Sequence, residues 1–169
     1  DSMMESVIKT LDVITKRDQE GDYRKSRQEV LERFPLLRGK ALELFVTAEV
    51  FYKKFENEDA LDYAPVLLEY CRAVETALWK YIEASDIYRK QGEESQKFKD
   101  QGQTFGAAVF AIKEPKDGPL RVFYRDLSRL HRFRNDSAHT TVAKEPDVRM
   151  EREKLWKSEL LNVLSKINE

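Results

Sequence analysis

Apolar residues recur at three- and four-residue intervals along nearly the whole chain, and this helical spacing is the feature that most limits the fold. The clearest case predicts a helix over residues 36–56, whose apolar face comprises Leu37, Ala41, Leu44, Phe45, Ala48, Phe51, Tyr52 and Phe55. Glycine and proline, which are abundant in turn-rich folds, number only six and five among 169 residues. Nothing in the pattern indicates a β-hairpin or a βαβ unit. The chain is therefore predicted to be an all-α helical bundle.

Six further helices are predicted from the same spacing and from their end signals. They cover a segment from about residue 7 to near residue 21, then 23–34, 61–89, 104–113, 119–134 and 147–167. The segment 104–113 is short and apolar, so a strand is an alternative there. Residues 90–103 are polar and contain two glycines, which indicates a loop or a weak helix. Residues 135–137, Asn-Asp-Ser, favour a turn, so the helix before them is expected to end near Arg134.

Charge and cysteine content exclude several classes of protein. Thirty basic and thirty-one acidic residues give a net charge of −1, so a nucleic-acid site must be a local patch. A single cysteine, Cys71, excludes an intramolecular disulfide framework and fits a reducing compartment, so a cytoplasmic location is expected. Two histidines and one cysteine give no zinc-ligand set, and we expect neither a metal nor another cofactor. No apolar run reaches membrane-spanning length, so no membrane partner is expected.

The helix expected over 119–134 places two polar side chains on or beside its apolar face. Arg134 continues the apolar stripe of this helix, and His131 projects about 60° away from it. A charge on such a stripe needs a partner or a wet cavity. The other arginines of this helix lie on its remaining faces, and they are Arg121, Arg125, Arg129 and Arg132. These four form either a solvated face or a set of phosphate contacts.

The helix expected over 61–89 carries a second pair of charged residues among apolar ones. Arg72 and Glu75 share a stripe with Leu68 and Trp79. Their three-residue spacing allows a local ion pair. Alternatively, Glu75 orients a functional arginine, or both residues line a polar cleft in the bundle. We favour a structural or supporting role for the two.

The most distinctive motif is the hexapeptide Arg134-Asn135-Asp136-Ser137-Ala138-His139. The planar guanidinium of Arg134 suits phosphate oxygens, and the imidazole of His139 is the side chain best able to move a proton near neutral pH. Together they could bind a phosphodiester and assist its cleavage without a metal. The alternative is a helix that ends in a turn, with an arginine that complements the helix dipole and a capping or surface histidine.

The hexapeptide resembles the Arg-x4-6-His signature of HEPN domains, including the asparagine that often follows the arginine. The segment 67–78, with its Arg and Glu three apart, also resembles another long helix of that family, and 147–167 would be the family's final amphipathic helix. The resemblance covers about residues 60–168. It implies a HEPN-like helical bundle over 58–169 and leaves 1–57 as an N-terminal helical extension.

The resemblance also implies an activity, because active HEPN domains are metal-independent endoribonucleases that work as dimers with facing motifs. Arg134 would stabilise charge on a phosphorane-like transition state, His139 would transfer protons, and Asn135 would contact the phosphate or fix the histidine. Attack by the RNA 2′-hydroxyl would leave 2′,3′-cyclic phosphate and 5′-hydroxyl ends.

The partners that the resemblance implies are RNA and a second copy of the chain. Further RNA contacts are expected from Arg125, Arg129, His131 and Arg132, with Arg72 and Glu75 supporting the site. The homodimer would form through the Arg134/His139 face, and an inhibitory or activating protein partner is expected in a defence or toxin–antitoxin context. Two other functions stay open: a catalytically silent HEPN domain that binds RNA or a nucleotide, and a helical protein-interaction domain with 1–57 as its docking arm.

Overall fold

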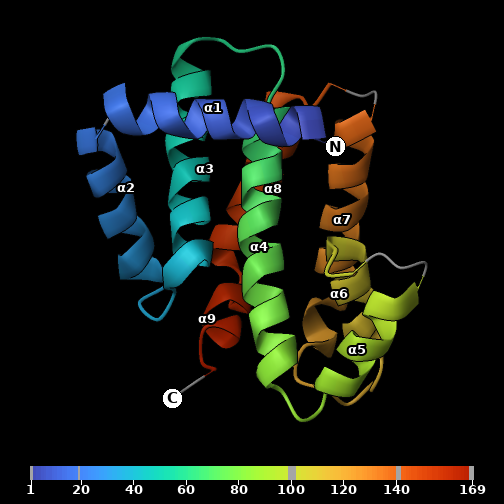
Figure 1. Ribbon diagram of the computed structural model, residues 1–169. Coiled ribbons are helices and arrows are strands. Elements are labelled where there is room, and N and C mark those ends of the chain that lie inside the picture. The colour runs from blue at the N-terminus through green and yellow to red at the C-terminus, as the bar shows by residue number, and fades with distance from the viewer. Residues whose placement is uncertain (1, 19, 99–101, 140–141, 168–169) are drawn as a thin grey trace.

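The computed structural model describes residues 2–18, 20–98, 102–139 and 142–167, with the backbone alone for 12–18, 20 and 139. Over these residues the protein is all-helical, as predicted (Figure 1). The helices are α1 (Ser2–Asp18), α2 (Glu20–Arg33), α3 (Gly39–Asn57), α4 (Ala64–Ala84), α5 (Arg89–Lys97), α6 (Phe105–Lys113), α7 (Tyr124–His139), α8 (Glu145–Lys157) and α9 (Leu160–Leu164), with a 3-10 turn η2 (Arg121–Phe123). Within this described part, no helix combines the length and the apolar character needed to cross a membrane.

Helix α4 lies at the centre of the bundle, with α3 beside it, α8 and α9 behind it, and α6 and α7 on the other side (Figure 1). Its residues are apolar on nearly every face, which is typical of a helix that is surrounded by others. The first helix, α1, lies across α3 and α4 and contacts both. One core extends over both sides of the division expected after residue 57, because Phe45 of α3 and Tyr70 of α4 pack with ring centroids 5.3 Å apart.

Serine and threonine side chains set several helix boundaries. The helix expected over 61–89 ends at residue 84, because the Ser85 hydroxyl accepts hydrogen bonds from the backbone of residues 87 and 88 and starts a new turn before α5. The helix expected over 147–167 is likewise divided at Ser158, whose hydroxyl accepts from the Leu160 amide at 3.0 Å. Thr104 caps α6 by accepting from the Ala107 amide, so the helix predicted over 104–113 is confirmed and its strand alternative is wrong.

The turn expected at residues 135–137 is wrong, because α7 continues through them to His139. Asparagine favours turns when its amide competes for nearby backbone groups. Here the Asn135 amide instead meets two side chains of its own helix, Arg134 and His131. Residues 131, 134, 135 and 138 consequently lie along one face of α7.

Two sets of contacts fix the position of α7. A carboxylate oxygen of Asp62 accepts from the Ala64 amide at 2.9 Å and from the Ala143 amide at 3.1 Å. The Tyr63 amide donates to the Ala143 carbonyl at 2.8 Å, so the chain that follows α7 is held at the start of α4. On the outer side, Arg129 of α7 pairs with Glu151 of α8 at 2.9 Å.

Candidate functional site

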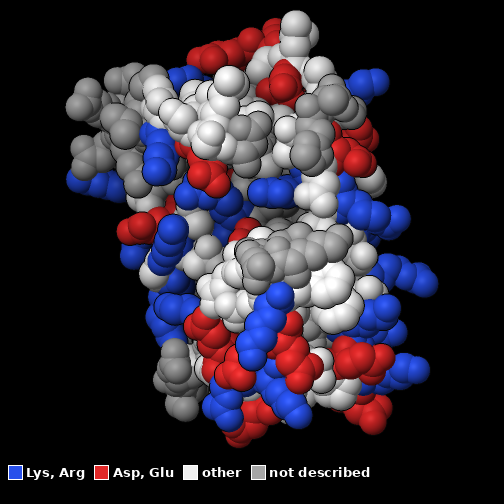
Figure 2. Space-filling model, turned by 45° about the vertical axis from the view of Figure 1, so that its right-hand side comes forward, with Lys and Arg blue, Asp and Glu red and all other residues white. Residues whose placement is uncertain are grey.

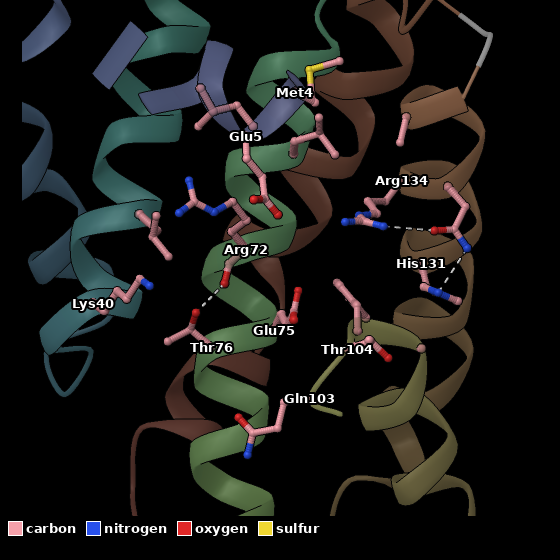
Figure 3. A pocket seen from close by; sticks show the side chains of 17 residues that line it. Met4, Glu5, Lys40, Arg72, Glu75, Thr76, Gln103, Thr104, His131 and Arg134 are labelled. Atoms are coloured by element: carbon pink, nitrogen blue, oxygen red, sulfur yellow. Dashed lines mark hydrogen bonds between the residues drawn. The ribbon is translucent and has the colours of Figure 1, made fainter. Parts of the chain in front are cut away.

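A pocket of about 680 Å³ lies between α1, α3, α4, α6 and α7. In Figure 3, Glu5 of α1 lies above it, Glu75 of α4 lies at its base, and Arg134 reaches in from α7. Figure 2 shows that this face of the molecule is hollowed, with basic and acidic side chains around the hollow. Elements that are far apart in the sequence therefore converge on one polar cavity.

Helix α7 supplies one wall through four residues that share a face of the helix, His131, Arg134, Asn135 and Ala138. Nη1 of Arg134 donates to Oδ1 of Asn135 at 3.3 Å. Nδ2 of the same amide lies 3.1 Å from Nε2 of His131. The guanidinium, amide and imidazole thus form a chain along the pocket wall, visible as dashed lines in Figure 3.

The first turn of α6 holds the His131 ring in place. The ring stacks on Phe105, with centroids 5.7 Å apart and planes 28° from parallel. That turn is itself anchored to α4, because Nε1 of Trp79 donates to the Thr104 carbonyl at 3.0 Å. Burial, together with the nearby charge of Arg134, lowers the pKa of His131 below its ordinary value of 6.5. The imidazole is therefore neutral at pH 7.

Helix α4 contributes Glu75 and Arg72 to the pocket, which places both residues in the polar cleft that the sequence allowed. Burial raises the pKa of the Glu75 carboxyl, whereas the charges of Arg134 and Arg72 lower it. Arg72 forms its ion pair one turn earlier, with the fully buried Glu69, at 2.5 Å. Glu75 is therefore a desolvated carboxylate whose neighbouring charges include the guanidinium of Arg134.

The pocket is slightly positive. Among its described lining residues, Lys40, Arg72 and Arg134 are cationic and Glu5 and Glu75 are acidic, which gives a formal net charge of +1 with the histidine neutral. The N-terminus of α6 also borders it, and the dipole of a helix adds partial positive charge at that end. Such a site favours an anion.

The remaining arginines of α7 lie away from the pocket. At about 100° per residue, Arg125 and Arg132 project about 180° and about 160° from Arg134, and both are exposed. Arg129 binds Glu151 through two hydrogen bonds, at 2.9 and 3.3 Å, and a neighbouring Asp126 at 2.7 Å. The structure therefore brings only His131, of the four expected RNA contacts, beside Arg134. Arg129 instead links α7 to α8.

His139 is the last residue of α7, and its side chain lies outside the described residues. Ala138 beside it lines the pocket, so the pocket wall reaches along α7 to the residue before His139.

Three parts of the pocket wall were not predicted from the sequence: Lys40, Glu5 and the turn at Phe105 and Gly106. Lys40 and Glu5 belong to segments expected to form an extension, and nothing local distinguishes them from surface charges. The α6 turn carried a weak signal, a threonine cap before an apolar helix with a glycine in its first turn.

The chain matches no protein-family model, no curated protein and no solved structure. Its chemistry is described from the pocket's own groups. The pocket holds the guanidinium of Arg134, with an amide and a neutral imidazole within hydrogen-bonding reach of one another. Such groups are suited to holding a phosphate ester and to transferring a proton. Within the described residues, no group of three or more His, Cys, Asp and Glu is placed to hold a metal.

Proposed function

We propose that this protein is a metal-independent endoribonuclease with a HEPN-like bundle, and that its catalytic centre is the pocket at Arg134. The observation that carries the proposal is the position of Arg134. It lies on the inner face of α7 and reaches into a positive pocket beside Asn135 and a neutral imidazole (Figure 3). The Arg-Asn pair of the motif thus faces a cavity instead of ending a surface helix.

The chemistry follows from these groups. An RNA phosphodiester binds with its non-bridging oxygens on Arg134, and Lys40 adds positive charge for the flanking phosphate backbone. The 2′-hydroxyl attacks the adjacent phosphorus, the O2′–P bond forms and the P–O5′ bond breaks. Arg134 stabilises the extra negative charge of the transition state. His139 takes the proton of the 2′-hydroxyl, and the protonated His139 of the second copy in the proposed homodimer gives a proton to the departing 5′-oxygen.

A homodimer through the Arg134/His139 face is part of this proposal. Leu61 and Val142 are 91% and 52% exposed, and they flank the hydrogen bonds that join residues 62 and 63 to Ala143 just beyond α7. Burial of these apolar side chains would favour a contact between two copies beside the motif. An inhibitory or activating protein that binds the same face would regulate the enzyme.

A second function, binding of a nucleotide without cleavage, is favoured by the roof of the pocket. Met4, Glu5 and Ile8 of α1 cover one side of it. A partly covered cavity of about 680 Å³ suits a single small ligand as well as one unit of a longer strand.

Cleavage of a structured RNA pool and tRNA in excess EDTA tests the proposal. Wild type is compared with Arg134→Ala, and with Arg132→Ala as the matched control, because Arg132 is an exposed arginine on the opposite face of α7. Cleavage that is lost in Arg134→Ala and kept in Arg132→Ala supports the ribonuclease. Binding of RNA or a nucleotide by a folded wild type that never cleaves supports the second function, and equal cleavage by both variants contradicts the assigned site.

A further inference from the structure

The amide of Asn135 is oriented by Arg134. Arginine can only donate hydrogen bonds, so Nη1 at 3.3 Å must meet the amide oxygen, Oδ1. The NH2 group of the same amide therefore faces His131, where Nδ2 lies 3.1 Å from Nε2. Because an NH2 group only donates, Nε2 of His131 must be the unprotonated nitrogen. This contact requires a neutral imidazole with its proton on Nδ1.

The ring has little freedom to leave this position on the side of α6. Phe105 stacks on one side of it. A Cβ atom added at Gly106 would lie 3.0 Å from Nε2 and 3.1 Å from Cε1, closer than ordinary van der Waals contact. The absence of a side chain at Gly106 thus allows the imidazole to reach Asn135. His131 sits in a slot that α6 shapes for its ring.

We propose that His131 is a positioning residue: its neutral imidazole holds the Asn135 amide, the amide holds the Arg134 guanidinium, and anion binding in the pocket weakens when His131 takes up a proton. This inference rests on the anion site of the proposed function. A protonated His131 presents an N–H to the NH2 group of Asn135, and two donors cannot bond. The amide must turn, and it then presents NH2 instead of oxygen to Arg134.

The expected direction is opposite to that of simple electrostatics. The charged groups that share the pocket with His131 are Arg134 on its own helix, Glu75 and Arg72 on α4, Glu5 on α1 and Lys40 on α3, and the described first turn of α6 adds none. An additional positive charge among these groups would by itself attract an anion more strongly. Positioning predicts weaker binding on acidification, so the sign of the pH dependence separates the two roles.

The probe is a thymidine dinucleotide joined by a phosphodiester, whose charge does not change between about pH 5 and about pH 8 and which lacks the 2′-hydroxyl needed for cleavage. For wild type, we expect affinity to fall about fivefold on acidification, the effect of one hydrogen bond. His131→Gln offers a carbonyl oxygen to Asn135 and does not titrate, so its pH profile reports the other groups of the pocket, Glu75 included. On acidification its affinity should exceed that of the wild type about fivefold. His131→Leu offers no acceptor, so its affinity should be about fivefold lower at every pH.

A ligand-free readout separates this inference from the ribonuclease proposal. Long-range ¹H–¹⁵N spectra of the wild type at neutral pH should show His131 with its proton on Nδ1, and in Asn135→Ala this preference should disappear. Absence of RNA cleavage together with these results overturns the ribonuclease and leaves the positioning role. A proton on Nε2 in the wild type, a pH dependence of affinity equal to that of His131→Gln, failure to bind the dinucleotide, or wild-type affinity in His131→Leu overturns the inference.

Discussion

Replacement of Gly106 by alanine tests the slot that holds His131. The new Cβ would lie 3.0 Å from Nε2, whereas ordinary contact begins near 3.4 Å, so the ring must retreat by about 0.4 Å. Overpacking typically costs about 1–3 kcal/mol, and the low end applies because the ring borders a pocket into which it can move. Alanine in a helix offsets up to about 1 kcal/mol of this cost. The net change in the free energy of unfolding is therefore close to zero.

Affinity for the dinucleotide should fall in Gly106→Ala although the free energy of unfolding does not change. Movement of the ring breaks or lengthens the 3.1 Å contact between His131 and Asn135, and the loss of one hydrogen bond reduces affinity for the thymidine dinucleotide about fivefold. Urea unfolding and dinucleotide titration measure the two effects. Gly21→Ala in α2 is the matched control, because a Cβ there meets no atom within 4 Å. Wild-type affinity and an unchanged His131 tautomer in Gly106→Ala would refute the reasoning.

Three further substitutions have distinct expected outcomes. Burial raises the pKa of Glu75, so ionisation of this carboxyl destabilises the folded protein increasingly as pH rises above about 4.5. Glu75→Gln should therefore be more stable to urea than the wild type at pH 7 and should lose this advantage below about pH 4.5. Equal stability of the two proteins at pH 7 would contradict the assignment. Arg129→Met leaves the nearly buried Glu151 carboxylate unpaired, so the free energy of unfolding in urea should fall by about 3 kcal/mol. Affinity for the dinucleotide should not change. Weakened binding would show that Arg129 takes part in the site. Asp62→Ala removes the acceptor of the Ala143 amide, whose hydrogen exchange should accelerate about tenfold or more, and unchanged exchange would show that Asp62 does not hold this segment.

The helical class could be predicted from the sequence because apolar periodicity reflects which faces are buried. The members of the predicted stripe from Ala41 to Tyr52 are buried in α3, whereas Leu37 precedes the helix and Phe55 is half-buried. Boundaries were less predictable, although Ser85 and Ser158 each start a new turn by accepting a hydrogen bond from the backbone amide two residues later. A periodic pattern continues through such caps and conceals them.

The site was predictable in part. A charge on an apolar stripe requires a special environment, which singled out Arg134, and Arg134 does line the pocket. Asn135, which also lines it, was singled out only by the resemblance to the HEPN motif. The extension of α7 to His139 was missed because the turn preference of asparagine is local, whereas its amide here bonds to Arg134 and His131. Lys40 reaches the pocket only through the packing of α3 on α4, which no local pattern encodes.

The identity of the RNA ends tests the central claim most directly. Purified wild type would be incubated in excess EDTA with an RNA and with the same sequence carrying 2′-deoxyriboses, and the products would be analysed by mass spectrometry. Cleavage of the RNA alone, leaving 2′,3′-cyclic phosphate and 5′-hydroxyl ends, is the expected result. Cleavage of the deoxyribose strand, or ends that carry a 5′-phosphate, would show that the 2′-hydroxyl is not the nucleophile and would contradict the proposed mechanism.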